Sequence, residues 1–381
     1  MRLVVWEWRK LFRLPALWVF VGLCLVFNIL LLAGPSAQDR AFFHDTSADA
    51  AALGQRVDDD FLTGLDTLPD TENREILHQS VEGLDNIFTH YDTGELTAFY
   101  QNLMAGDSLA QSWTEWKYKL LQDRVDHLAQ TGAALDLYAG PITHDSHQYL
   151  YNTLFRALVT EGILLGLLCA IYLVGYEDMT GTQKLACASQ TGRRLWKHKV
   201  LAALAAALGL YALLSLLTLV PYFLLWDYSG IWSASVSSQF NYYTDMLYPR
   251  PFLTWVDLTV GGYLGAMVAA GGGLVLVFTL LGSVAGLVTG HSYGAAITMA
   301  VVCALLLGLV YSLANLGLWW VYLLTNFSPV NLWLSINGWF TELGQLGTIP
   351  WQETAGLGFN LLAGSGLSLL ALKHFGRKDV A

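Results

Sequence analysis

Long apolar runs recur along this sequence and constrain its fold more than any other feature. The first extends from residue 14 to residue 33 without a charged side chain, and further long runs follow after residue 150. A helix of about 20 apolar residues is long enough to cross the hydrocarbon core of a bilayer. The composition agrees, because 13% of the residues are charged, against about 25% in soluble globular proteins. We therefore predict an all-α polytopic membrane protein.

Six transmembrane helices account for the apolar runs. The first occupies residues 14–34, and the other five belong to a membrane region at 151–381. The expected bounds of those five are 151–176, 200–226, 258–288, 295–324 and 355–372. The fourth is rich in glycine and contains the triplet Gly271, Gly272 and Gly273. Glycines allow close helix packing, and a glycine cluster can also kink a helix, so the sequence is compatible with either role.

Charged residues are distributed unevenly around these spans. Residues 35–150 hold 20 of the 30 acidic residues but only six of the 20 Lys and Arg residues. Basic clusters occur instead at 2–13, 184–199 and 373–378. Basic residues near span ends favour the cytoplasmic side of a membrane. We therefore predict a multi-pass protein of the cell membrane, with both termini cytoplasmic and residues 35–150 extracytoplasmic.

Residues 1–13 have the pattern of an amphipathic helix. Apolar residues such as Val4, Leu11 and Phe12 share one helical face, and most of the charged residues fall elsewhere. A basic amphipathic helix that contains tryptophan is typical of the membrane interface. The residues expected to contact membrane lipids are Trp6, Trp8, Arg9, Lys10 and Arg13. The alternative is a plain cytoplasmic segment that leads into the first span.

The polar segment at 35–150 is predicted to form an exported helical domain. Helical spacing of apolar residues begins after the capping candidates Asp70 and Thr71 and continues to residue 91. A second helix is expected at 107–130. Its core face is expected to consist of Leu109, Trp113, Trp116, Leu120 and Leu128.

Metal sites in this domain are not supported by the sequence. The two histidines His144 and His147 lack the further ligands that a zinc site needs. The acidic run at 58–60 lacks the spacing and the glycine of a calcium loop. We therefore predict no metal ion.

Two further segments are expected at the outer side of the membrane. Residues 227–255 carry aromatic side chains typical of an interfacial belt, namely Trp232, Tyr242, Tyr243, Tyr248 and Trp255. Residues 326–353 are aromatic and nearly uncharged but contain Pro329 and Pro350. That pattern favours a short re-entrant helical hairpin, which requires a backbone buried in protein.

Two ionisable residues, Arg156 and Glu161, lie near the expected outer end of the second span. Charges near an interface can reach water or pair across helices, which favours an interfacial pair. A deeper position for Glu161 would instead make it a candidate residue of a transport pathway.

A short polar island at 177–199 separates the second and third spans. It begins with Glu177 and Asp178, turns at Gly181-Thr182, and ends with the basic residues Arg193, Arg194, Lys197 and Lys199. A polar segment between two spans is expected to be a loop, and its basic end predicts a cytoplasmic location.

The layout of the whole chain resembles the permease subunits of ABC-2-type exporters, also called type V. In that family an interfacial helix precedes the first span, a loop between the second and third spans docks on the ATPase, and a re-entrant pair lies between the fifth and sixth spans. The corresponding segments here are 2–13, 177–199 and 326–353. Many members also carry an exported domain between the first two spans, as at 35–150.

The resemblance implies a set of ATPase-coupling residues, which are Glu177, Gly181, Thr182, Leu185, Ser189, Arg193, Arg194 and Lys197. The loop departs from many members because no proline precedes its arginine. The resemblance also implies two ATPase subunits and a second permease copy or a paralogue as partners, with lipids, peptides or antibiotics as typical substrates. A simpler interpretation of the basic residues is that they only set the topology.

Several other functions lack support in the sequence. No Gly-x-x-x-x-Gly-Lys-Ser/Thr segment occurs, so ATP hydrolysis is expected in a partner chain. The sequence contains no zinc-protease motif and no nucleophile with a placed base, so we do not predict an enzyme, and we predict no cofactor. It also lacks a basic stripe of the kind that binds nucleic acid, so we predict no nucleic-acid partner. Two alternatives to a permease are a sensor or immunity module that uses residues 35–150, and a secondary carrier. The few intramembrane ionisable residues and the absence of repeats disfavour the carrier.

Overall fold

The structure is a computed structural model that describes residues 2–242 and 252–377. Across these residues the regular secondary structure is helical, apart from isolated β-bridges. Six of the described helical segments are long enough and apolar enough to cross a membrane. The predicted all-α fold with six candidate spans is therefore confirmed. Of the residues singled out above, Tyr243, Tyr248 and Lys378 lie outside the described ranges.

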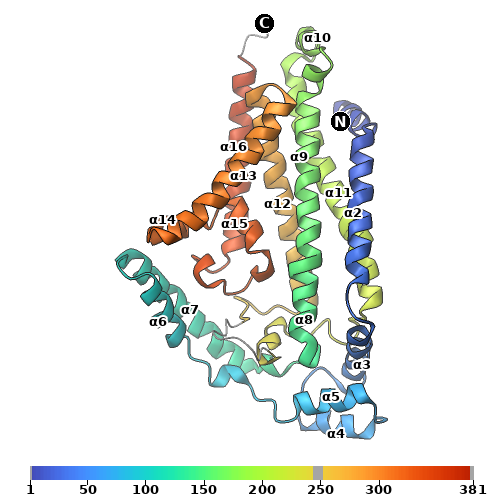
Figure 1. Ribbon diagram of the computed structural model, residues 1–381, viewed down its shortest axis with the longest axis vertical. Coiled ribbons are helices and arrows are strands. Elements are labelled where there is room, and N and C mark those ends of the chain that lie inside the picture. Colours follow the sequence, from blue (N-terminus) through green and yellow to red (C-terminus); the bar gives the residue numbers. More distant parts are fainter. Residues whose placement is uncertain (1, 243–251, 378–381) are drawn as a thin grey trace.

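The candidate spans form a long bundle with two distinct ends (Figure 1). Their helices are α2 (Pro15–Ala33), α9 (Arg156–Met179), α11 (Leu195–Leu225), α12 (Val260–Thr289), α13 (Ser292–Asn315) and α16 (Gln352–Phe375). The 180–194 loop lies at one end of the bundle, which we call the loop end. Most of residues 35–150 lie toward the opposite end, which we call the domain end.

Two span bounds differ from the sequence prediction. The fifth span ends at Asn315 instead of near residue 324, because Gly317 adopts a left-handed backbone with φ of 69° and α14 (Trp319–Thr325) follows as a separate helix. The continuous helical segment that contains the second span begins before the expected residue 151, because a π-helical segment at Tyr149–Phe155 joins α8 (Thr143–Gln148) to α9. Helical structure therefore continues from the polar domain into this span.

Glycines allow α9, α11 and α12 to pack closely at the centre of the bundle. A Cβ atom at Gly162 of α9 would lie 2.8 Å from side-chain atoms of Tyr211 and Val275. A Cβ atom at Gly271 of α12 would lie 2.4 Å from the Tyr211 hydroxyl oxygen. The helix α12 continues without a break through the glycine triplet. These glycines therefore allow close packing in this structure.

The N-terminal residues form α1 (Arg2–Phe12), which packs against α11 and α9 at the loop end. Leu11 is fully buried, and Trp8 Nε1 donates a hydrogen bond to the carbonyl of Ala202 at 2.9 Å. Leu14 is extended, and Pro15 begins α2, where its missing N–H removes no helical hydrogen bond. The chain therefore leaves α1 and starts the first span as a new helix.

The polar segment folds into short helices, as predicted. They include α3 (Ala37–Leu53), α4 (Asp59–Thr67), α5 (Glu72–Val81), α6 (Gly94–Leu103) and α7 (Ser108–Thr131). The side chain of Asp58 accepts a hydrogen bond from the Phe61 amide, so the acidic run at 58–60 caps and begins α4. Thr71 caps α5 in the same way. The expected continuation to residue 91 fails because Gly83 has φ of 73°.

The predicted core face of α7 is wrong for three of its five residues, whereas Leu128 is buried as predicted and Trp113 is half-buried. Leu109 and Trp116 of that face are exposed, and Leu120 lies at the surface. The buried residues of α7 are Ala110, Thr114, Lys117, Tyr118, Leu121, Val125 and Leu128. The difference arises from tertiary packing. The helix α7 packs against α6 and also contacts residues 342–348, where Glu342 accepts a hydrogen bond from the buried side chain of Lys117.

Residues 326–353 contain one short helix, α15 (Pro329–Leu334), and 3-10 turns at Ile336–Gly338 and Gly344–Leu346. This arrangement stands in place of the predicted helical hairpin. Leu332, Ile336 and Trp339 are fully buried, and Trp339 Nε1 donates to the carbonyl of Leu332 at 3.0 Å. The irregular backbone is therefore packed within protein, as an apolar environment requires.

The described parts of 227–259 close the bundle at the domain end. Tyr242 is buried, and Trp232 and Trp255 are half-buried. The backbone amide of Glu342 donates to the carbonyl of Leu253 at 2.9 Å. These aromatic residues therefore pack largely on protein instead of forming a fully exposed belt.

Candidate functional site

The loop between the second and third spans begins with a tight turn. Gly181 adopts φ of 66°, a conformation that glycine reaches at little cost. The amide of Thr182 donates to the carbonyl of Glu177 at 2.8 Å, which ends α9. The short helix α10 (Gln183–Ala188) follows, and the Ser189 hydroxyl accepts a hydrogen bond from the Gly192 amide at 3.2 Å. The predicted Gly-Thr turn is therefore present.

Four of the predicted coupling residues have exposed side chains, and we call these four the docking face. They are Leu185, Ser189, Arg194 and Lys197. Leu185 is 73% exposed, although it is a large apolar residue. Arg193 behaves differently, because it is half-buried and its guanidinium donates to the carbonyl of Gly376 after α16. It ties the loop to the last span.

Glu177, the first predicted coupling residue, is only 4% exposed and does not belong to the docking face. Its carboxylate oxygens lie 2.9 Å from Lys10 Nζ and 2.5 Å from Lys199 Nζ. Glu7 completes the group, at 2.7 Å from Lys10 Nζ and 3.0 Å from Lys199 Nζ. We call Glu7, Lys10, Glu177 and Lys199 the ion-pair junction.

The ion-pair junction connects α1, the end of α9 and the start of α11. Lys199 is fully buried, and its ammonium also donates to the carbonyl of Leu173 at 2.7 Å. The ring of Tyr176 lies 4.7 Å from Lys10 Nζ and 5.5 Å from Lys199 Nζ, which adds cation–π attraction. Glu7, Glu177 and Lys199 are buried and Lys10 is half-buried, and the charges of the two acids and the two lysines balance one another.

Lys10 shows the electrostatic effect of this arrangement. Burial by itself lowers the pKa of Lys10, but the hydrogen bonds that Lys10 donates to Glu7 and Glu177, together with the negative charges of these acids, outweigh that effect and raise the pKa. Lys10 therefore stays protonated, and its charge remains available to both carboxylates.

The five residues predicted to contact lipid separate into two groups. Trp6 is 59% exposed, Arg9 and Arg13 are exposed, and the Arg9 guanidinium lies 4.9 Å from the Trp6 ring. Trp8 and Lys10 instead contact α11 and the ion-pair junction. Sequence reasoning missed the junction, although the single acid Glu7 within a basic segment was a signal for it.

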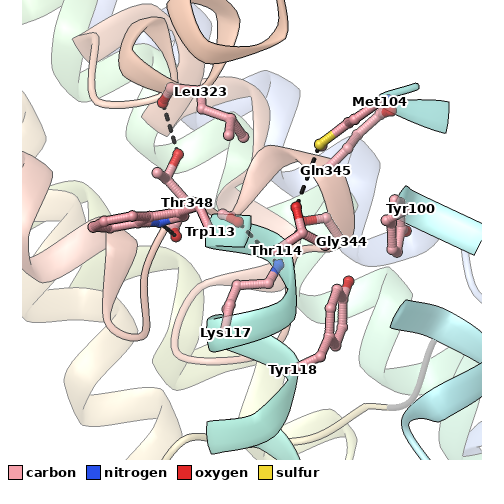
Figure 2. Close-up of a pocket in the computed structure, with 11 residues that line it drawn as sticks. Tyr100, Met104, Trp113, Thr114, Lys117, Tyr118, Leu323, Gly344, Gln345 and Thr348 are labelled. Atoms are coloured by element: carbon pink, nitrogen blue, oxygen red, sulfur yellow. Dashed lines mark hydrogen bonds between the residues drawn. The ribbon is translucent and has the colours of Figure 1, made fainter. Parts of the chain in front are cut away.

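A second polar contact joins α7 to residues 342–348 at the domain end. Lys117 Nζ lies 2.8 Å from Glu342 Oε1 and 2.9 Å from each of the carbonyl oxygens of Gly344 and Gly347. The Tyr118 hydroxyl donates to the same Glu342 oxygen at 2.9 Å. Figure 2 shows Lys117 and Tyr118 on α7 close to Gly344. We call these five residues the domain junction.

The domain junction is closed to ligands. The cavity beside it has a volume of about 10 Å³, which is about the room that one water molecule needs. Trp113 Nε1 donates to the carbonyl of Thr348 at 2.6 Å and Thr348 Oγ1 donates to the carbonyl of Leu323 at 2.7 Å. The contact therefore fastens the polar domain to the last third of the chain.

Among the described residues, no group of three His, Cys, Asp or Glu side chains is placed to hold a metal ion. His147 is fully buried, and its ring lies 4.5 Å from that of Tyr151 and 4.7 Å from that of Phe252. This histidine packs as part of an aromatic core.

Comparisons with known proteins give no relative: no family model, curated protein or solved structure matches this chain.

Proposed function

We propose that this protein is the permease subunit of an ABC transporter of the ABC-2 type. In this proposal it exports an amphiphilic or bulky substrate, such as a lipid, peptide or antibiotic. Separate ATPase subunits dock on the 177–199 loop from the cytoplasm, and a second copy of the chain or a paralogue completes the membrane part. The observation that carries the proposal is that the 177–199 loop holds the exposed docking face and is fastened at its two ends by the ion-pair junction.

The physical argument concerns transmission of force. A loop that only set topology would need basic residues but no rigid connection to the spans. Here Glu177 and Lys199 lie at the two ends of the loop and bind each other and α1. A push on the loop would therefore move α1, α9 and α11 together as a rigid group, which is one of the established forms of conformational transmission.

The sensor alternative draws on a different observation, the domain junction. Because Lys117 and Glu342 connect the polar domain to the 326–353 segment, a ligand of that domain could influence the spans. An ATPase partner distinguishes the two proposals, since a non-transporting sensor needs none.

We expect the variant Arg194→Glu with Lys197→Glu to lose co-purification with the proposed ATPase subunit, when the two are co-expressed. Both side chains are exposed on the docking face, so charge reversal replaces attraction to partner acids with repulsion without disturbing the core. Reversal of each exposed charge is expected to leave membrane insertion intact.

The control is Lys373→Glu, which reverses an exposed charge near the end of α16 but outside the loop. It should retain the ATPase. Retention of the ATPase by the Arg194/Lys197 variant, or equal loss in the control, would contradict docking on this loop.

The proposed orientation makes a second prediction, which uses the native Cys187 of α10. Cys187 is half-buried in the loop. The experiment uses a variant in which the other three cysteines are replaced by alanine, so that Cys187 is the single thiol. A membrane-impermeant maleimide should label it in inside-out vesicles and leave it unlabelled in intact spheroplasts. A cysteine placed at the exposed Ser112 of α7 should show the reverse pattern. Labelling of Cys187 from outside would refute the orientation.

A further inference from the structure

An apolar groove lies between α2 and α9, with α15 at its edge. Its volume is about 520 Å³, within the roughly 300–1,000 Å³ that is common for small-molecule sites. Phe20, Leu23 and Phe27 of α2 line one wall, and Leu164 of α9 lies on the other. We call this space the lateral groove. Figure 1 shows α2 beside α9 along the length of the bundle.

Glu161 of α9 also lines the lateral groove. It is 7% exposed, and one carboxylate oxygen accepts a hydrogen bond from Asn28 Nδ2 at 2.9 Å. The same amide group donates to Thr218 Oγ1 at 3.1 Å, and the Cys24 thiol lies beside the carboxylate. Within residues 2–242 and 252–377, no Lys, Arg or His nitrogen lies within ion-pair distance of Glu161.

Arg156, the predicted partner of Glu161, also lines the lateral groove, but its guanidinium binds the 326–353 segment and not Glu161. Its guanidinium donates to the carbonyl of Leu334 at 3.1 Å and to Asn337 Oδ1 at 3.2 Å, and it lies 6.0 Å from the Trp333 ring. The five-residue separation on one helix corresponds to about 7.5 Å along the axis. The predicted pair of Arg156 and Glu161 is therefore not formed, and Glu161 is the deeper of the two.

The polarity of the side chains that line the groove changes along its length. Glu161 and Asn28 lie at one level because they share a hydrogen bond. From that level toward the loop end, Leu164, Leu23 and Phe20 provide an apolar wall, and the eight residues from Asn28 to Phe20 extend for about 12 Å of helix. Toward the domain end the lining is more polar, with Asn152, Thr153 and Arg156, so Glu161 lies where the apolar part of the groove begins.

We propose that the lateral groove binds a long-chain amine, an amphiphile whose ammonium group adjoins a single apolar tail. A carboxylate at membrane depth is costly unless it is paired, and the side chains that hydrogen-bond to this one, Asn28 and Cys24, are neutral. An ammonium ion would complete an ion pair with Glu161, while the tail would lie against Leu164, Leu23 and Phe20. The inference concerns binding alone, and it stands whether or not an ATPase docks at the loop end.

The test uses the full chain purified in detergent and three photoreactive hexadecyl probes, which are an amine, an alcohol and a carboxylate with the same diazirine in the tail. We expect the amine to label peptides of α2 and α9 most strongly and to be displaced by unlabelled hexadecylamine. The variant Glu161→Gln should bind hexadecylamine about tenfold more weakly, equivalent to about 1.4 kcal/mol, without changing the labelling by the alcohol.

Leu164→Trp provides a steric test, because it fills the groove and should reduce labelling by the amine. Leu362→Trp is its control, since Leu362 is 78% exposed on α16 and does not line the groove. Equal labelling by the three probes, or amine labelling that survives both Glu161→Gln and Leu164→Trp, would overturn the proposal. If Glu161→Gln fails to fold, two results test the proposal instead. The unmodified chain should be labelled more strongly by the amine than by the alcohol or the carboxylate, and Leu164→Trp should lose this preference.

Discussion

Replacement of Lys199 by methionine is expected to lower the free energy of unfolding by about 3–5 kcal/mol, the usual cost of removing one partner from a buried ion pair. Lys199 is fully buried between Glu7 and Glu177. Its removal leaves both carboxylates with Lys10 as the single cation of the junction, so net negative charge remains in a region of low dielectric constant. Unfolding of the purified chain in detergent, titrated with a denaturing detergent and checked by thermal melting, measures the effect.

Two further variants test the electrostatic explanation. Glu177→Gln combined with Lys199→Met restores neutrality and should recover much of the lost stability, because burying well-packed neutral groups is often no worse than burying an ion pair. Lys184→Met, at an exposed position of the same loop, should change stability by less than about 0.5 kcal/mol. A double variant no more stable than Lys199→Met would contradict the explanation.

Replacement of Lys117 by methionine is expected to detach α7 from residues 342–348. Lys117 and Glu342 are both buried, and the lost ammonium serves one carboxylate and two carbonyl groups. The local cost should again be about 3–5 kcal/mol. Hydrogen exchange followed by mass spectrometry should show faster exchange in α7 and at 342–348, with little change in α9 and α12.

The matched control is Lys119→Met, two residues along the same helix but exposed. It should leave exchange unchanged. The pair Lys117→Met with Glu342→Gln should exchange more slowly than Lys117→Met alone, because no unpaired charge is buried. Uniform acceleration across all spans would show that the junction stabilises the whole fold and not this contact.

The helical fold could be predicted from the sequence because its signals are local. A span is recognised by the length of one apolar run, as for α2 and α12, and a helix start by one capping side chain, as for Thr71. The early ends of α5 and α13 follow from Gly83 and Gly317, whose positive φ values the apolar pattern does not reveal.

The candidate site was only partly predictable. The Gly181-Thr182 turn and the exposed Arg194 and Lys197 agree with the sequence reasoning. Glu177 and Lys10 were expected to face partners or lipid, yet they bind each other across 167 positions of the chain. No local pattern contains that information, since a charged residue at a helix end looks the same whether it faces water or a second helix.

The sequence by itself determined the class of protein, the number of candidate spans and the polar character of the loop and of residues 35–150. Each of these depends on the free energy of transferring a continuous segment from water into an apolar environment, which composition and length determine. The tertiary structure alone decided which charges are paired. Arg156 reaches the 326–353 segment and leaves Glu161 without a cation, whereas Lys199 reaches Glu7 and Glu177. Ion pairing depends on distances of a few ångströms between segments that only the packed helices bring together.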